Sequence, residues 1–104
     1  MRLSTQEGST IFNVLSQLDG HCEIYLYGSR ADDALRGGDI DLLVFSDKLT
    51  FSDKITALVE IKDILGEQKI DLTIRPFSAR HSDPFVMEIM KTAVPIAAPP
   101  EGGG

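Results

Sequence analysis

The sequence has 104 residues, of which 42% are hydrophobic and 25% charged, and its formal net charge is −6. These values predict one globular domain with a modest core, and the acidic balance argues against a binder of duplex nucleic acid. No apolar run approaches the roughly 20 residues of a membrane span, and the N-terminus has no apolar signal core, which predicts a cytoplasmic protein. The single cysteine, Cys22, gives no disulfide framework.

The chain opens with a predicted amphipathic helix over residues 4–18, ended by the turn residues Asp19 and Gly20. The apolar residues at helical spacing are Ile11, Val14, Leu15 and Leu18. Residues 22–27 then alternate as a strand, with Cys22 expected as a small buried hydrophobe.

A glycine and a serine, Gly28 and Ser29, follow this strand. Glycine lets the backbone approach a ligand closely, and the serine hydroxyl and first free N–H groups of a short helix at 29–35 predict a phosphate site. Arg30 has two interpretations, a contact to phosphate or a structural salt bridge.

Two aspartates open the second predicted strand, residues 39–46. Asp39 and Asp41 are two positions apart, so their side chains share one face of the strand. Two neighbouring carboxylates repel each other unless a cation lies between them, and Mg²⁺ accepts one or two protein carboxylates together with phosphate oxygens. Turn chemistry after two glycines would explain Asp39, but it does not explain Asp41, an acid inside an apolar strand.

The next helix is predicted over residues 51–65, capped by Thr50 and ended by Gly66. Its expected apolar stripe is Phe51, Ile55, Leu58, Val59 and Leu65. Residues 69–74 form the third predicted strand, in which Asp71 lies opposite the apolar face. If this strand pairs beside the second, Asp71 joins Asp39 and Asp41.

A last helix is predicted to begin at Asp83 as cap and Pro84 as first residue. Its expected apolar face is Phe85, Val86, Ile89 and Met90. Arg75 and Arg80 are expected either to lie exposed on the surface or to touch phosphates. Residues 94–97 are expected to dock as a short extended segment, and the tail 98–104 is expected to be disordered, which leaves residues 1–97 as the domain.

The predicted fold class is α+β, with two layers and a small mixed sheet of three or four strands packed against helices. Gly28 and Ser29, nine intervening residues, and then Asp39-Ile40-Asp41 resemble the signature of the DNA polymerase beta-like nucleotidyltransferase superfamily. Residues 26–31 and 39–44 are similar to the minimal nucleotidyltransferases (MNT proteins), small prokaryotic proteins often encoded beside a HEPN-domain toxin. Asp32 and Asp33 stand where many minimal members have a basic residue and a glycine.

The resemblance implies the polymerase beta-like fold, with Asp39, Asp41 and Asp71 as catalytic metal ligands for Mg²⁺. It implies that Gly28, Ser29 and Arg30 bind ATP, and that AMP passes to a hydroxyl, a tyrosine, of a cognate HEPN toxin. The protein would then be an antitoxin in a hetero-oligomer, with no direct contact to nucleic acid or membrane.

Two other interpretations stay open. The protein could be a binding module that neutralises the toxin by complex formation alone, which the acidic Asp32 and Asp33 favour. It could also be an aminoglycoside-type nucleotidyltransferase, although no second domain for a small-molecule acceptor is expected.

Overall fold

The computed structural model describes residues 3–28, 39–66 and 69–97. Its helices and strands follow one another as α1 (Thr5–Leu18), β1 (Glu23–Tyr27), β2 (Ile40–Phe45), α2 (Phe51–Leu65), β3 (Ile70–Arg75), α3 (Ala79–Ser82), α4 (Pro84–Met90) and β4 (Val94–Pro95). No helix in these ranges is both long and apolar enough to cross a membrane. The helix expected over residues 29–35 and the tail 98–104 lie outside the described residues.

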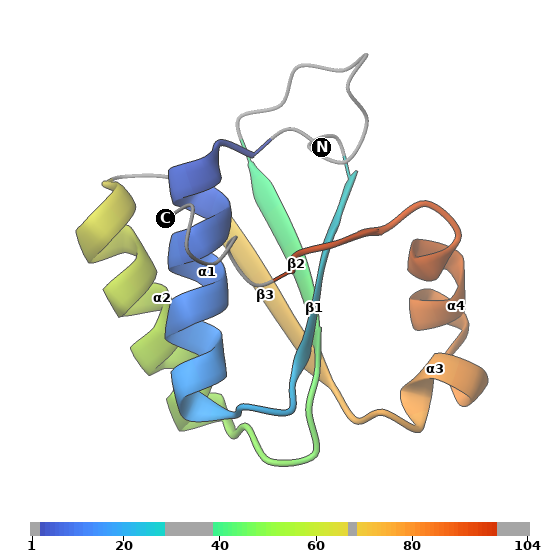
Figure 1. Ribbon diagram of the computed structural model, residues 1–104. Coiled ribbons are helices and arrows are strands. Elements are labelled where there is room, and N and C mark those ends of the chain that lie inside the picture. Colours follow the sequence, from blue (N-terminus) through green and yellow to red (C-terminus); the bar gives the residue numbers. More distant parts are fainter. Residues whose placement is uncertain (1–2, 29–38, 67–68, 98–104) are drawn as a thin grey trace.

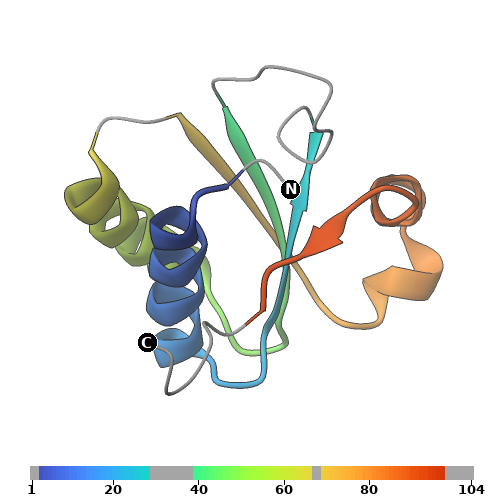
Figure 2. The ribbon, with the colours of Figure 1, turned by 45° about the horizontal axis from the view of Figure 1, so that its top comes forward.

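The four strands form one mixed sheet in the order β3-β2-β1-β4 (Figure 1). β1 pairs antiparallel with β2 and with β4, whereas β2 and β3 run parallel. The parallel pair needs a crossover connection, and α2 supplies it. β4 lies beside β1, so the segment expected to dock near the C-terminus adds the fourth strand (Figure 2). The predicted α+β fold with a small mixed sheet is confirmed.

Helices lie on both sides of the sheet. α1 and α2 cover one face, while α3 and α4 lie on the other side (Figures 1 and 2). The main core lies under α1 and α2, and its fully buried members include Ile11, Leu15, Leu26, Leu42 and Ile61. A smaller cluster on the opposite face contains Leu43, Phe45, Ala79 and Val86. Successive side chains of β2 point to opposite faces of the sheet, so the strand contributes residues to both clusters.

The ends of α1 follow the chemistry of their capping residues. Ser4 accepts a hydrogen bond from the Glu7 amide, and the Glu7 carboxylate accepts one from the Ser4 amide, which is a capping box. Asp19 ends the helix as predicted. Cys22 packs against the main core, and burial raises the pKa of its thiol to about 11, consistent with an inert packing role.

α2 begins and ends as predicted, but its expected apolar stripe is wrong in part. Leu58 and Leu65 pack against the core, whereas the side chains of Phe51, Ile55 and Val59 are exposed. The fully buried residues of α2 are instead Ala57 and Ile61. The helix lies over β3 and beside α1, so only the part of its surface that faces both is covered.

The C-terminal helices hold one further correction. Asp83 caps α4 by accepting a hydrogen bond from the Phe85 amide, and Pro84 occupies the first turn, as predicted. Phe85, expected on the apolar face, is 49% exposed, and Val86 is the buried residue. The short helix α3 was not expected from the sequence.

Candidate active site

The predicted carboxylates gather where β1 ends and β2 and β3 begin. Asp39 immediately precedes β2, Asp41 is its second residue, and Asp71 is the second residue of β3. Because β2 and β3 run parallel in register, Asp41 lies directly beside Asp71. Antiparallel pairing with β1 places Tyr27 on the other side of Asp41. The condition set by the sequence, that the second and third strands are neighbours, is met.

The negative charges of these carboxylates repel one another, and burial and this repulsion together raise the pKa of Asp41. Asp41 is partly buried, and its pKa is raised first by that burial and then by the negative charges of Asp71 and Asp39. The charge of Lys69 acts in the opposite direction. Lys69 Nζ lies 3.8 Å from Asp39 Oδ2, and both side chains are largely exposed. Among the described residues, the site therefore carries more negative charge than Lys69 compensates, which is the condition under which a cation binds.

Gly28 is required at its position for two reasons. Its φ of 78° lies in the left-handed region, which residues with a side chain rarely adopt. A Cβ atom at this position would also overlap the Oδ2 atom of Asp41. The sequence predicted that a ligand approaches the backbone at Gly28, whereas the group that the structure places there is the Asp41 carboxylate.

Tyr27 also belongs to this group of side chains. It packs against the smaller core cluster, and burial is the main cause of its raised pKa. The charges of Asp41 and Asp71 raise it further, whereas a hydrogen bond with Thr73 lowers it. The alternation of β3 could have placed Thr73 on the carboxylate face, because it lies two positions from Asp71. Tyr27 joins that face because it pairs with Asp41, and this register is set by the tertiary structure.

The predicted phosphate-binding residues cannot be placed with the carboxylates. Ser29 and Arg30 lie outside the described residues, as do Asp32 and Asp33. Of the residues expected to bind ATP, the structure describes Gly28 alone, at the end of β1 and in contact with the carboxylate group.

The donor set fits a divalent cation such as Mg²⁺. Asp41 and Asp71 offer hard oxygen donors from adjacent strands, and one or two carboxylates suffice when water and substrate phosphates complete the shell. Within the described ranges, no three or more carboxylate, histidine or cysteine side chains form a ready group for one metal ion. The set of three ligands, Asp39, Asp41 and Asp71, stays a prediction.

The two arginines expected at the surface or at phosphates have other partners. Arg80 is partly buried, forms an ion pair with Glu23, and stacks over the Phe45 ring with its guanidinium carbon 4.6 Å from the centroid. Arg75 Nη1 donates to the Ile74 carbonyl at 3.0 Å, and its Nε lies 3.5 Å from Asp83 Oδ2. Both lie toward the end of the sheet remote from the carboxylates, because Arg75 pairs with Phe45, four positions beyond Asp41.

Comparison with known proteins gives one family. The family model described as "Polymerase beta, Nucleotidyltransferase" matches residues 9–100. The match runs from α1 to beyond β4 and includes Gly28 and all three aspartates. No curated protein matches the chain.

Proposed function

The chain belongs to the polymerase beta nucleotidyltransferase family, and on this premise we propose that it transfers AMP from ATP to a tyrosine hydroxyl of a cognate HEPN-domain toxin. In this proposal the protein is an antitoxin. The observation that supports the catalytic part is the pairing of Asp41 with Asp71 on adjacent parallel strands. Asp39 lies two positions before Asp41, directly before the strand begins. The nature of the acceptor is supported by the similarity of residues 26–31 and 39–44 to the minimal nucleotidyltransferases.

The aspartates have separate roles in the proposed reaction. Asp41 and Asp71, with Asp39, would hold Mg²⁺, which when bound supplies positive charge against the triphosphate and the reacting oxygens. Asp41 is anchored in the sheet between Tyr27 and Asp71, so its carboxylate is positioned before substrate arrives. Asp71 is exposed, and one of its carboxylate oxygens would take the proton of the acceptor hydroxyl.

The bond changes are those of an in-line displacement. The acceptor oxygen attacks the α-phosphorus of ATP, a new oxygen–phosphorus bond forms, and the bond to the bridging oxygen breaks. Pyrophosphate leaves with the bonding electrons, and AMP stays on the acceptor. Asp71 holds the released proton until solvent removes it.

The test is a mass measurement on the toxin. The purified chain, ATP, Mg²⁺ and the product of the neighbouring gene are incubated, and the toxin is expected to gain mass in whole AMP units. Asp41→Asn and Asp71→Asn should abolish the gain while leaving the fold intact. The matched control is Asp63→Asn, because Asp63 is an exposed aspartate on α2, a helix that covers the opposite face of the sheet from α3 and α4.

Two results would contradict the proposal. A tight complex without mass gain, in Mg²⁺ and in Mn²⁺ and with several nucleotides, would indicate a binding module that neutralises the toxin by contact. Full neutralisation of the toxin by the Asp41→Asn variant would lead to the same conclusion.

A further inference from the structure

The outer edge of β3 has unpaired backbone groups. The Ile40 amide donates to the Lys69 carbonyl and the Ser46 amide donates to the Arg75 carbonyl, each at 2.9 Å. In a parallel ladder alternate residues bond the neighbouring strand, so Ile70, Leu72 and Ile74 direct their N–H and C=O groups away from β2. Among the described residues, the Ile74 carbonyl accepts a hydrogen bond there from the Arg75 guanidinium. In the described ranges no strand pairs with this side of β3, and such an edge is a template for another strand.

The helix beside this edge exposes an apolar stripe. Phe51, Ile55 and Val59 lie four residues apart, so they follow one side of α2, and their exposures are 74%, 45% and 63%. Three bulky apolar side chains in a row on a small acidic protein indicate a surface that another protein covers.

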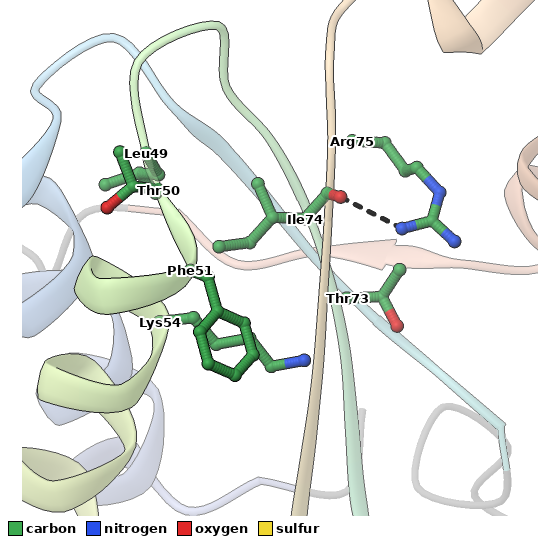
Figure 3. Close-up of a pocket in the computed structure, with 7 residues that line it drawn as sticks. All are labelled: Leu49, Thr50, Phe51, Lys54, Thr73, Ile74 and Arg75. Atoms are coloured by element: carbon green, nitrogen blue, oxygen red, sulfur yellow. Dashed lines mark hydrogen bonds between the residues drawn. The ribbon is translucent and has the colours of Figure 1, made fainter.

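A hollow joins the stripe to the strand edge. Its volume is about 420 Å³ and its lining residues are Leu49, Thr50, Phe51, Lys54, Thr73, Ile74 and Arg75. Figure 3 shows Phe51 and Lys54 on one side of β3 and Thr73 and Arg75 on the other. The hollow therefore straddles the edge of the strand, where an added strand would lie.

We propose that a second copy of this chain occupies this surface. The two copies pair their β3 strands antiparallel around a twofold axis, so that both sheets become one continuous sheet and the two α2 stripes contact each other. The inference is independent of the proposed enzymatic function.

The sequence of β3 is suited to pairing with itself. An axis at Leu72 sets Leu72 beside its own copy and Ile70 opposite Ile74 of the partner subunit. Directly opposed residues in such a pair exchange both hydrogen bonds, and these are the residues whose backbone groups point outward. Their apolar side chains also share the face on which α2 lies, so the pairing leaves no apolar side chain on the wrong face.

The same axis makes the helical stripe complementary to itself. α2 runs opposite to β3 (Figure 1), and Phe51 lies near Ile74 in the hollow. Four helical residues advance about 6 Å, roughly the length of two strand residues, so Ile55 lies near the level of Leu72 and Val59 near Ile70. Ile55 then meets Ile55 of the partner subunit, and the large Phe51 meets the smaller Val59 of the partner subunit.

The charged residues at the two ends of the pairing are each compensated within their own chain. Lys69 comes opposite Arg75 of the partner subunit, and each base already has a carboxylate beside it. Lys69 lies 3.8 Å from Asp39, and Arg75 lies 3.5 Å from Asp83. Each end of the dimer thus gathers two bases and two acids, so the like charges of Lys69 and Arg75 are offset by Asp39 and Asp83. Because each chain carries a net charge of −6, added salt should strengthen association by screening the remaining repulsion.

The experiment is sedimentation equilibrium of the full chain from low to high micromolar concentration. The expected species has twice the chain mass of 11.4 kDa. Ile55→Glu brings two carboxylates together at the axis and should weaken the dimer at least tenfold. The matched control is Ile64→Glu, because Ile64 is also exposed, at 54%, but lies nine residues and about 2.5 turns away, on the opposite side of α2. Both positions are exposed, so both variants should fold, which circular dichroism checks.

Charge reversal completes the test. An equimolar mixture of Ile55→Glu and Ile55→Lys chains should form a mixed dimer at lower concentration than either variant alone forms its own dimer. A wild-type chain that stays monomeric at every concentration and salt level would overturn the proposal, as would a dimer that Ile55→Glu leaves intact or that Ile64→Glu weakens equally.

Discussion

At the scale of single residues, the candidate site depends on the space between Gly28 and Asp41. The glycine combines a left-handed φ with the absence of a side chain, and the Asp41 carboxylate occupies the space that a Cβ would need. Asp41 in turn is held beside Asp71, with a raised pKa that records both its burial and the nearby charges. One glycine therefore determines where a carboxylate of the site can lie.

We predict that Gly28→Ala lowers both stability and activity. The free energy of unfolding should fall by about 1–3 kcal/mol, since alanine strains the backbone and its methyl group displaces the Asp41 carboxylate. Urea unfolding measures the loss. The control is Gly8→Ala in α1, where an added Cβ meets nothing within 4 Å. That variant should instead gain about 0.5–1 kcal/mol, and a similar loss in both variants would contradict the argument.

The second prediction at this scale concerns pH. Folded Asp41 holds its proton more tightly than unfolded Asp41, so its charge lowers stability as pH rises from the usual value of 3.8 to the raised pKa. In EDTA, Asp41→Asn should therefore be more stable than the wild type at pH 7, and the difference should vanish below about pH 3.8. Thermal unfolding across pH measures this.

Mg²⁺ provides the control for that measurement. Added Mg²⁺ should raise the melting temperature of the wild type and have little effect on Asp41→Asn, because the variant lacks one of the two paired carboxylates. A wild type that is more stable than Asp41→Asn at pH 7 in EDTA would show that the carboxylate is compensated in another way.

At the scale of elements, α2 shows which features depend on neighbouring residues in the sequence and which depend on tertiary packing. Its first residue is fixed by the capping box of Thr50 and Asp53, and its end is fixed by Gly66 with φ of 89°. These are interactions within one turn of chain, and the sequence predicted both ends. The buried side was predicted wrongly at Phe51, Ile55 and Val59, because burial depends on where the helix lies against β3 and α1.

The capping box leads to a third prediction. Thr50→Ala removes the hydroxyl that accepts a hydrogen bond from the Asp53 amide at 3.2 Å, and should lower the free energy of unfolding by about 1 kcal/mol. Thr56→Ala is the control, since Thr56 is exposed in the middle of the same helix, where alanine is the better helix former. Chemical denaturation compares the two, and equal losses would rule out the capping explanation.

At the scale of the whole molecule, one buried hydrogen bond joins segments far apart in the chain. Ser46, after β2, donates to Asp19 at the end of α1 with a distance of 2.6 Å. Asp19 also accepts from the His21 amide, while Ser46 accepts from the amides of Lys48 and Leu49. The bond ties the helical layer to the sheet at the end opposite the candidate site.

The fourth prediction tests this bond. The hydrogen bond from Ser46 is the main reason that the pKa of Asp19 is lowered, so its contribution is present above pH 3.8 and is lost as pH falls through the lowered pKa. Ser46→Ala should cost roughly 1.5–3 kcal/mol at neutral pH and less in acid. Ser52→Ala, at an exposed serine of α2, should cost little at any pH. A loss for Ser46→Ala that is independent of pH would contradict the assignment.

The sequence by itself determined the ends of α1 and α2, the start of α4 and the faces of the strands, and it predicted three aspartates as the candidate site. The helix ends and strand faces depend on caps, turns and alternation within a few residues, so local spacing suffices to predict them. Asp71 was assigned to the site from the family resemblance and on the condition that the second and third strands pair. The tertiary structure decided that Asp71 lies beside Asp41, that the Asp41 carboxylate occupies the space beside Gly28, and that Arg80 pairs with Glu23. It also left one side of α2 and the edge of β3 uncovered. These features join residues that are distant in the chain, and only the packing of the sheet and helices brings them together.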